Sequence, residues 1–361
     1  MTPKVSIVLP VRNEEKFLEE CLKSILQQTL THWELIAIDD HSTDESHQIL
    51  ETFAQEDSRV RIFKNPGNGI SDCLNYAIYL AKSSLIARMD GDDLMEPKRL
   101  EIQVDHLDKN KKVGLIASQV EPFPKAIKTQ RKGHELYVQW TNEILTPEEH
   151  SINRFVDCPF AHPSIIFRKS LINYYGGYAK GIIPEDFELW LRWMGHGVVM
   201  EKLPQVLLKW RDHPKRASRT NLGYTPSAFQ KVKAKYLRQW LEEEFTLGKR
   251  IILCWGAGRV AREFFSLLKK EGIRISGFID PDPKKINKQI ATLPIMPIER
   301  IPSPKQCFIL ILAVARGVRK KTAEYLQEHG YVLGHDFLPL ALFFNLFQIA
   351  SKHSIIHKVF P

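Results

Sequence analysis

Residues 5–13 have the sequence VSIVLPVRN, and the pattern that begins here continues through the first quarter of the chain. The run from Val5 to Leu9 is almost entirely apolar, which is typical of a strand buried on both faces of a sheet. Asn13 is a good N-cap, and apolar residues then recur with helical spacing at positions 17, 18, 21, 22, 25 and 26. The segment therefore predicts a buried strand followed by an amphipathic helix.

The alternation of strand and helix continues as far as residue 89. Further apolar strands are expected at 35–38, 60–63 and 85–89, and amphipathic stretches separate them. Alternation of this kind predicts a parallel sheet with helices on both faces, and hence an α/β fold.

Three polar clusters follow these strands: PVRN at 10–13, DDHSTD at 39–44 and DGDD at 90–93. In open parallel sheets, ligands bind beyond the carboxyl ends of the strands. Carboxylates gathered there repel one another unless a cation or hydrogen-bond donors lie among them. Each cluster alone is better explained by ordinary turn and N-cap chemistry. Together, at successive strand ends, the clusters favour a metal-bound phosphate ligand.

Length and composition limit the class of protein. A chain of 361 residues predicts two domains with a connector, and 43% hydrophobic residues exclude collagen-like or mostly disordered proteins. The net charge is +9, and residues 209–250 hold eleven basic and four acidic residues, so seven of these charges lie there. Such a segment could face nucleic acid, an anionic membrane surface, a phosphate-bearing substrate or only solvent.

The cysteines and the apolar stretches bear on location. The five cysteines are widely spaced and include no CxxC pair, which argues against a disulfide framework and fits a reducing compartment. The sequence has no signal-peptide core and no apolar stretch of 18 residues. We therefore expect a cytoplasmic protein that is at most peripheral at the inner face of the membrane.

The clusters and a later block resemble the family 2 glycosyltransferases, which are nucleotide-sugar enzymes of GT-A-type fold. The resemblance covers about residues 4–219, and its motifs occur in the family's order. They are VSIVLPVRN at 5–13, IDDHSTD at 38–44, ARMDGDD at 87–93, HPS at 162–164, GGY at 176–178, EDFELWLR at 185–192 and WRDH at 210–213. His41 and Gly91 stand where glycine and alanine are commoner.

The resemblance implies a donor site and a metal site. Asp39 would hydrogen-bond the base, Asp90 would lie near the ribose, and a four-residue loop would wall the nucleotide pocket. That loop consists of Pro10, Val11, Arg12 and Asn13. Asp92 would ligate Mn²⁺ or Mg²⁺ that bridges the diphosphate of the donor, which is expected to be a UDP-sugar.

The later block implies the remaining groups of the site. Asp186 would be the general base of an inverting displacement, although it could instead be a carboxylate that serves a helix dipole. His213 would return to the metal or the diphosphate, and Arg211 would contact the diphosphate. A structural hydrogen bond for His213 and a surface position for Arg211 beside Asp212 are equally consistent with the sequence. For His162, a structural or acceptor-side role is preferred over metal ligation.

A second domain is expected after a connector. A strand at 251–255 leads into the turn Gly256-Ala257-Gly258, and Asp280 follows Gly258 by 22 positions. This spacing predicts a smaller Rossmann-like α/β domain, with Gly256, Gly258 and Asp280 as a possible second nucleotide site. A docking role without a ligand is equally consistent. The expected domains are a catalytic domain at 1–223, an amphipathic connector helix at 224–248, the Rossmann-like domain at 249–340 and a C-terminal tail at 341–361.

The sequence thus predicts a metal-dependent, inverting glycosyltransferase that uses a nucleotide-sugar donor and a glycan or lipid-linked acceptor. The alternative enzyme is a nucleotide-dependent oxidoreductase centred on the C-terminal domain. No nucleic-acid partner is expected, because the carboxylate-rich strand ends would repel phosphate in the absence of a metal.

Overall fold

The computed structural model describes residues 2–124, 132–244, 250–312 and 316–340. The C-terminal tail expected at 341–361 lies outside the described residues. The chain divides into two compact units, the first made of Met1–His150 and Pro159–Gly223, the second of Ser151–Cys158 and Tyr224–Pro361. None of the helices in the described ranges combines the length and the hydropathy that a bilayer crossing requires.

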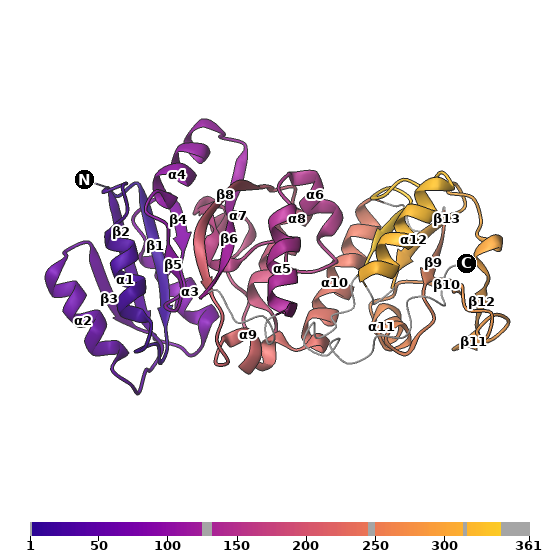
Figure 1. The fold of residues 1–361 in the computed structure, drawn as a ribbon, viewed down its shortest axis with the longest axis horizontal. Helices are drawn as coiled ribbons and strands as arrows, with labels where there is room; N and C mark the ends of the chain where they lie inside the picture. The colour runs from indigo at the N-terminus through magenta and orange to yellow at the C-terminus, as the bar shows by residue number, and fades with distance from the viewer. Residues whose placement is uncertain (1, 125–131, 245–249, 313–315, 341–361) are drawn as a thin grey trace. The chain divides into compact units, whose positions relative to one another are not determined.

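The first unit is built on an eight-stranded sheet with the order β3-β2-β1-β4-β7-β6-β8-β5. Its first four strands are parallel where they pair, as the alternating pattern predicts (Figure 1). These strands are β1 (Val5–Val11), β2 (Trp33–Asp39), β3 (Val60–Lys64) and β4 (Leu85–Arg88). The predicted α/β fold class is confirmed.

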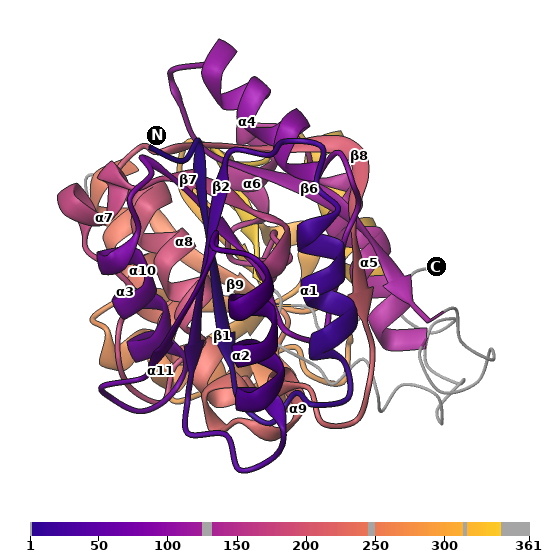
Figure 2. The ribbon, with the colours of Figure 1, turned by 90° about the vertical axis from the view of Figure 1, so that its left-hand side faces the viewer.

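Three helices connect the parallel strands. They are α1 (Leu18–Leu26), α2 (Ser46–Glu56) and α3 (Ile70–Leu80). Figure 2 shows α1 and α3 on opposite sides of β1 and β2. The sheet is therefore covered on both faces, and its loops are left at the strand ends.

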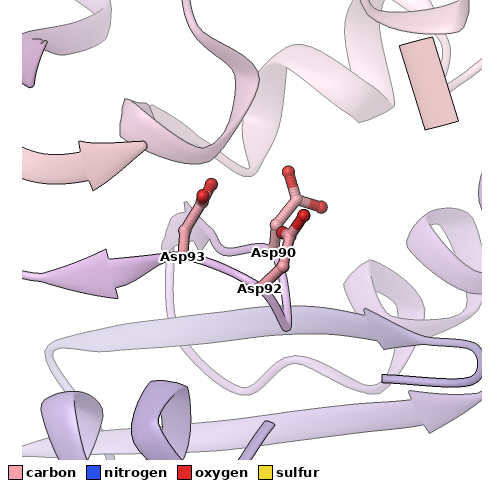
Figure 3. Close-up of side chains that lie close together, drawn as sticks. All are labelled: Asp90, Asp92 and Asp93. Atoms are coloured by element: carbon pink, nitrogen blue, oxygen red, sulfur yellow. The ribbon is translucent and has the colours of Figure 1, made fainter. Parts of the chain in front are cut away.

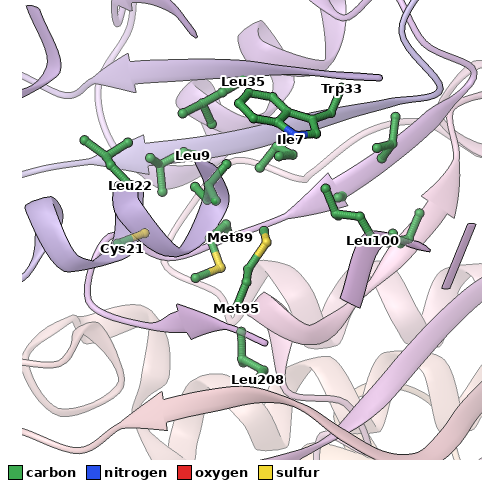
Figure 4. Close-up of a cluster of buried hydrophobic side chains, with 14 of the residues drawn as sticks. Ile7, Leu9, Cys21, Leu22, Trp33, Leu35, Met89, Met95, Leu100 and Leu208 are labelled. Carbon is green, nitrogen blue, oxygen red and sulfur yellow. The ribbon is translucent and has the colours of Figure 1, made fainter. Parts of the chain in front are cut away.

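The core under α1 takes in alternate residues of β1, namely Val5, Ile7, Leu9 and Val11. Ile7 and Leu9 share this core with Leu22 of α1, and all three are at most 1% exposed (Figure 4). Burial of each such side chain contributes roughly 1.5–3 kcal/mol to folding. The packing fixes α1, and with it the loop that joins β1 to α1, relative to the sheet.

The other half of the sheet is mixed rather than parallel. β7 runs antiparallel to β4 and β6, whereas β8 is parallel to β6 and antiparallel to β5. These strands are β5 (Leu94–Met95), β6 (Val113–Phe123), β7 (Ile166–Arg168) and β8 (Val199–Arg211). The helices of this part are α4 (Arg99–Lys109), α5 (Lys132–Glu143), α6 (Pro147–Asn153), the 3₁₀ turn η1 (His162–Ser164), α7 (Ser170–Tyr175), α8 (Glu185–Gly195), α9 (Ala217–Thr220) and η2 (Leu222–Tyr224).

The second unit holds a six-stranded sheet with the order β11-β12-β10-β9-β13-β14. The strands β12, β10, β9, β13 and β14 pair in parallel, and β11 is antiparallel to β12. They are β9 (Ile251–Trp255), β10 (Ile275–Ile279), β11 (Gln289–Ile290), β12 (Leu293–Met296), β13 (Cys307–Ile311) and β14 (Phe337–Pro339). The helices are α10 (Pro226–Glu244), α11 (Arg259–Lys270), the 3₁₀ turn η3 (Ile298–Arg300) and α12 (Arg316–Glu328). A second α/β sheet therefore follows the first, as predicted.

Candidate active site

The three polar clusters meet at one edge of the first sheet. Because β2, β1 and β4 are neighbours and parallel, their carboxyl ends point the same way. Backbone hydrogen bonds tie the segments that follow β2 and β4 to β1. Asp40 N–H donates to Val11 O at 2.8 Å, and Met89 N–H donates to Val8 O at 3.1 Å. Residues far apart in sequence are thus brought to one place.

The loop after β1 is tied to the loop after β2. Asn13 has φ of 56°, a left-handed conformation that asparagine tolerates better than most residues. Its Oδ1 accepts a hydrogen bond from Thr43 N–H at 2.8 Å, and its own N–H donates to Ser42 Oγ at 3.1 Å. Val11 is buried, while the side chain of Arg12 is 57% exposed. Among the predicted wall residues, Val11 therefore lies in the core, whereas Arg12 is exposed to solvent.

The two aspartates after β2 differ in their surroundings. Asp39 Oδ1 accepts a hydrogen bond from Ser42 N–H at 3.0 Å, and His47 Nδ1 lies 3.2 Å from Asp39 Oδ2. Asp40 accepts hydrogen bonds from Asn65 Nδ2 at 2.6 Å and from Gly69 N–H at 3.0 Å. Asp40 therefore holds the loop after β3 in place, and Asp39 stands beside a histidine.

The two unusual residues of the clusters have local explanations. His41 has φ of 59°, which accounts for glycine being commoner there, and its Nε2 lies 3.0 Å from Gly67 O. A Cβ on Gly91 would lie 3.3 Å from Cγ of Glu14 and 3.6 Å from Cδ1 of Leu18. The glycine at 91 therefore leaves room for the Glu14 side chain.

The loop from β4 to β5 carries three carboxylates that face one another. Asp90, Asp92 and Asp93 each offer an oxygen within 4.8 Å of the others (Figure 3). Asp93 is almost fully buried, and its Oδ1 accepts a hydrogen bond from the backbone N–H of Arg211 at 2.7 Å. We call Asp90, Asp92 and Asp93 the acid triad.

The pKa values of the acid triad are shifted by burial and by the closeness of the carboxyl groups to one another. Burial, followed by repulsion from Asp92 and Asp90, raises the pKa of Asp93 well above its usual range. Burial also raises the pKa of Asp90, against the attraction of Arg88. For Asp92, burial alone would raise the pKa, but a hydrogen bond with His213 and the charge of Arg216 bring it below the ordinary value. The raised pKa values of Asp93 and Asp90 thus reflect both burial and the crowding of carboxyl groups at one point.

Glu14 adds a fourth carboxyl group to this region. Burial raises its pKa to about 8, and repulsion from Asp92, Asp90 and Asp44 contributes further. Hard divalent cations prefer such clustered carboxylate oxygens, and a cation would relieve the repulsion that these shifts record. The donor set of the acid triad therefore fits Mn²⁺ or Mg²⁺.

Three basic residues, Arg88, His213 and Arg216, lie near the acid triad. Arg88, which is almost fully buried in β4, forms an ion pair with Asp90. His213 Nε2 lies 2.8 Å from Asp92 Oδ2. The guanidinium of Arg216 lies 4.4 Å above the Trp210 ring and is held by His134 Nε2 at 2.7 Å. Arg216 thus brings a positive charge close to the carboxylates.

The side chain of Arg211, which was expected to contact the diphosphate, forms hydrogen bonds within the protein. Its Nε donates to the backbone oxygen of Asp92 at 2.6 Å, and its Nη2 donates to Glu20 Oε2 at 2.6 Å. The residue is only 7% exposed. Its guanidinium therefore lies inside the protein, behind the acid triad's loop.

Asp186 lies in the first turn of α8 and is buried. Its Oδ1 accepts a hydrogen bond from Phe187 N–H at 2.7 Å. Burial raises the pKa of Asp186 to about 6, while the Phe187 hydrogen bond and the charge of Arg88 act in the opposite direction. Repulsion from Asp90 also contributes, so Asp186 is electrostatically linked to the acid triad. A carboxylate with a raised pKa is suited to accept a proton near neutral pH.

His162 is part of the buried packing near Asp186. Its Nε2 lies 2.8 Å from Tyr178 Oη, and its ring packs against Trp190. Burial, reinforced by the charge of Arg88, lowers the pKa of His162 well below its usual value, so the ring is neutral. The hydrogen bond to Tyr178 and this packing agree with the preferred structural role.

The sequence interpretation missed three residues of this region: Glu14, Arg88 and Arg216. Glu14 directly follows the predicted N-cap Asn13, where an acidic residue is ordinarily explained by the start of a helix. Arg88 had a usable signal, because an arginine within the apolar run 85–89 must find a partner when the strand is buried. Arg216 had no specific signal, since it is one of eleven basic residues at 209–250.

In the second unit, Asp280 is hydrogen-bonded to the turn at residues 256–258. Asp280, which is 4% exposed, accepts a hydrogen bond from Ala257 N–H at 2.8 Å and a contact from Lys285 Nζ at 3.0 Å, both at Oδ2. Its Oδ1 accepts a hydrogen bond from Asp282 N–H at 3.0 Å. Gly256 has φ of 110°, and Gly258 precedes α11. Both oxygens of Asp280 thus have protein donors, and these hydrogen bonds close the turn that holds Gly256 and Gly258.

Comparison with known proteins identifies the class. Residues 6–175 match the family described as Glycosyl transferase family 2. The chain is 31% identical over 226 residues to the O-antigen biosynthesis glycosyltransferase WbnJ of Escherichia coli, covering 61% of this chain and 84% of that protein. It is 30% identical over 238 residues to the UDP-Gal:alpha-D-GlcNAc-diphosphoundecaprenol beta-1,3-galactosyltransferase of Escherichia coli, covering 65% and 83%. The crystal structure of S. aureus TarS 1-349 in complex with UDP-GlcNAc aligns with a TM-score of 0.48 at 17% identity, covering 68% of this chain and 74% of that one.

The chain therefore belongs to glycosyltransferase family 2, as the motifs predicted. It is a glycosyltransferase, and its relatives include a glycosyltransferase of O-antigen biosynthesis. The oxidoreductase alternative gains no support from these comparisons.

Proposed function

We propose that this enzyme transfers a sugar from a nucleotide-sugar donor, a UDP-sugar, to a hydroxyl of a glycan or lipid-linked acceptor, with inversion at the anomeric carbon. The observation that carries the proposal is the acid triad together with His213 at one edge of the sheet. The name of a relative that uses UDP-Gal and a diphosphoundecaprenol acceptor supports both the donor and the acceptor class.

The proposed metal ligands are Asp92 and His213. The 2.8 Å separation of their side-chain atoms and the crowding of carboxylates support this assignment. When bound, Mn²⁺ or Mg²⁺ would stabilise the negative charge on the departing nucleoside diphosphate. Histidine nitrogen suits Mn²⁺ better than Mg²⁺, which strongly prefers oxygen.

The proposed donor pocket is lined by the loops after β1, β2 and β4. Asp39 accepts a hydrogen bond from the base, and Asp90 lies near the ribose. The walls are the four residues Pro10, Val11, Arg12 and Asn13. The hydrogen bonds that tie Asn13 to Thr43 support this grouping, because they hold two of the three loops together before a donor binds.

Asp186 is the proposed general base. It takes the proton of the acceptor hydroxyl while that oxygen attacks the anomeric carbon, and the bond from that carbon to the diphosphate oxygen breaks with both electrons leaving on the diphosphate. Support comes from the pKa of about 6, which leaves Asp186 mostly ionised at pH 7.5 and still able to accept a proton. A single displacement of this kind inverts the configuration.

A lipid-linked acceptor would place the enzyme in the cytoplasm at the inner face of the membrane. The basic residues at 209–250 support peripheral contact with anionic headgroups, because each exposed Lys or Arg near such a surface contributes about 1 kcal/mol.

The experiment that tests the proposal is a thermal-stability screen of nucleotide sugars with Mn²⁺, with Mg²⁺ and with a chelator. A ligand at about 100 times its Kd stabilises the native state by about 2.7 kcal/mol, so the true donor raises the melting temperature only when metal is present. The best donor is then tested for transfer, and the anomeric configuration of the product is read by NMR. Equal stabilisation in metal and chelator, or a product with retained configuration, contradicts the proposal.

A further inference from the structure

Arg211, the last residue of β8, is bound to the loop of the acid triad through both its backbone and its side chain. Its backbone N–H donates to Asp93 Oδ1 at 2.7 Å, and its Nε donates to the backbone oxygen of Asp92 at 2.6 Å. Two neighbouring residues of the loop are therefore held by one residue of another strand. Such a pair of contacts restrains both the position and the orientation of the loop that holds Asp92 and Asp93.

The rest of the Arg211 side chain is also engaged. Nη2 donates to Glu20 Oε2 of α1 at 2.6 Å. The guanidinium carbon lies 4.5 Å from the centre of the Phe17 ring and 4.6 Å from that of the Phe123 ring. Planar guanidinium groups are well suited to aromatic contacts of this kind, and a lysine cannot reproduce them together with the forked hydrogen bonds. Arg211 thus joins α1, the end of β6, the end of β8 and the acid triad's loop.

This arrangement determines how Asp92 meets His213. His213 follows Arg211 by two residues, and its Nε2 lies 2.8 Å from Asp92 Oδ2. Asp92 is therefore held at its backbone oxygen by Arg211 and at its carboxylate by His213. The Phe17 ring, which contacts Arg211, also lies 5.1 Å from the His213 ring. Movement of Arg211 would change the geometry of the Asp92–His213 pair.

We propose that Arg211 is a positioning residue that sets the relative geometry of Asp92 and His213, rather than a ligand of the donor diphosphate. The inference rests on the proposed function in one respect, namely that Asp92 and His213 hold the cation. Residues that orient metal ligands commonly change metal affinity by 10- to 100-fold when they are replaced. Replacement of Arg211 should therefore lower the affinity for the metal even when no nucleotide is present.

The test measures Mn²⁺ binding by electron paramagnetic resonance in the absence of nucleotide, and UDP binding by calorimetry at saturating Mn²⁺. We expect Arg211→Lys to raise the Kd for Mn²⁺ by about 10-fold or more while the Kd for UDP at saturating Mn²⁺ stays within about threefold. Glu20→Gln is the matched control, because it removes the charge of a partner that is 61% exposed but keeps an acceptor for Nη2. This control should leave both constants within about twofold.

Phe17→Leu provides a second variant in case Arg211→Lys does not fold. It keeps an apolar side chain but removes one aromatic contact from Arg211 and His213, and we expect about a threefold loss of Mn²⁺ affinity with UDP binding unchanged. Wild-type Mn²⁺ affinity with weakened UDP binding in folded Arg211→Lys would overturn the inference and make Arg211 a diphosphate ligand. Normal Mn²⁺ affinity in Phe17→Leu would likewise count against it. Failure of the wild type itself to bind Mn²⁺ would overturn the metal site of the proposed function, and the positioning role with it.

Discussion

His213 Nε2 lies 2.8 Å from Asp92 Oδ2, although 121 positions of sequence separate the two residues. Asp92 follows a parallel strand of the first half of the sheet, whereas His213 follows β8, which belongs to the mixed half. The contact therefore joins the two halves of the sheet at the candidate metal site. A cation held there would depend on both halves being folded.

Replacement of Asp92 by asparagine should abolish metal-dependent donor binding. The amide keeps the shape of the side chain but removes the charge that attracts a hard cation. Calorimetric titration with UDP and Mn²⁺ should show a Kd at least about 100-fold higher than that of the wild type. Asp108→Asn is the control, since Asp108 is an exposed carboxylate that pairs with Lys111 at 3.1 Å. Unchanged UDP affinity in Asp92→Asn would remove Asp92 from the metal site.

Replacement of Asp280 by alanine should destabilise the second unit without affecting transfer. The change leaves the N–H groups of Ala257 and Asp282 and the ammonium of Lys285 without their acceptor. A buried donor that loses its acceptor costs about 1–3 kcal/mol. Hydrogen exchange should therefore be faster in the turn at 256–258, while sugar transfer by the first unit stays within about twofold.

The competing prediction is that Asp280 belongs to a second nucleotide site. Nucleotides including NAD should then bind the wild type at a second site and lose affinity in Asp280→Asn, which keeps one acceptor oxygen. Detection of such a site by equilibrium dialysis, in protein whose first site is blocked by Asp92→Asn, would favour the nucleotide-binding role over the closed turn.

The parallel half of the fold was predictable because its signals are local. Apolar runs such as that from Val5 to Leu9 indicate buried strands, and parallel neighbours bring their carboxyl ends together whatever the loops contain. The residues that follow β2 and β4, Asp39 and Asp92 among them, could therefore be expected at the same edge of the sheet.

The mixed half was not predictable in the same way. β7 has only three residues, and its antiparallel pairing with β4 and β6 depends on contacts between distant segments. The partner of Arg211 on α1, Glu20, is 191 positions away, and nothing in either local sequence indicates the pair. A charged residue indicates that a partner is needed, but the sequence does not indicate which partner the packing supplies.

Asp186→Asn should be more stable than the wild type at pH 8. Burial raises the pKa of Asp186 in the folded state from 3.8 to about 6, so the ionised carboxylate destabilises the fold. This cost is absent below pH 3.8, grows between pH 3.8 and 6, and is complete above pH 6. Two pKa units correspond to roughly 3 kcal/mol, which is an upper limit for the gain from a neutral amide. Thermal unfolding should show a gain at pH 8 that shrinks at pH 5, and a lower melting temperature at pH 8 would contradict the assigned burial cost.

Asp186→Asn should also lose catalytic activity while it still binds the donor. A carboxylate is a weak base toward a free sugar hydroxyl, so it takes the proton only as the attacking oxygen bonds to the anomeric carbon. The effect therefore belongs to the transition state, and kcat should fall by roughly 10²–10⁴ while the Kd for the nucleotide sugar stays within a few-fold. Steady-state kinetics and calorimetry on the same preparation separate the two quantities.

The pH profile provides the sharper form of this test. Because Asp186 must be ionised to act as the base, kcat of the wild type should fall as the pH is lowered through about 6, where the carboxylate takes up a proton. That acid limb should be missing from the residual rate of Asp186→Asn. Glu185→Gln is the matched variant, since Glu185 is the neighbouring buried carboxyl in the first turn of α8, and it should keep both the limb and most of kcat. If Glu185→Gln instead loses the limb while Asp186→Asn keeps a normal kcat at saturating donor, then the base is Glu185 and Asp186 serves the start of the helix.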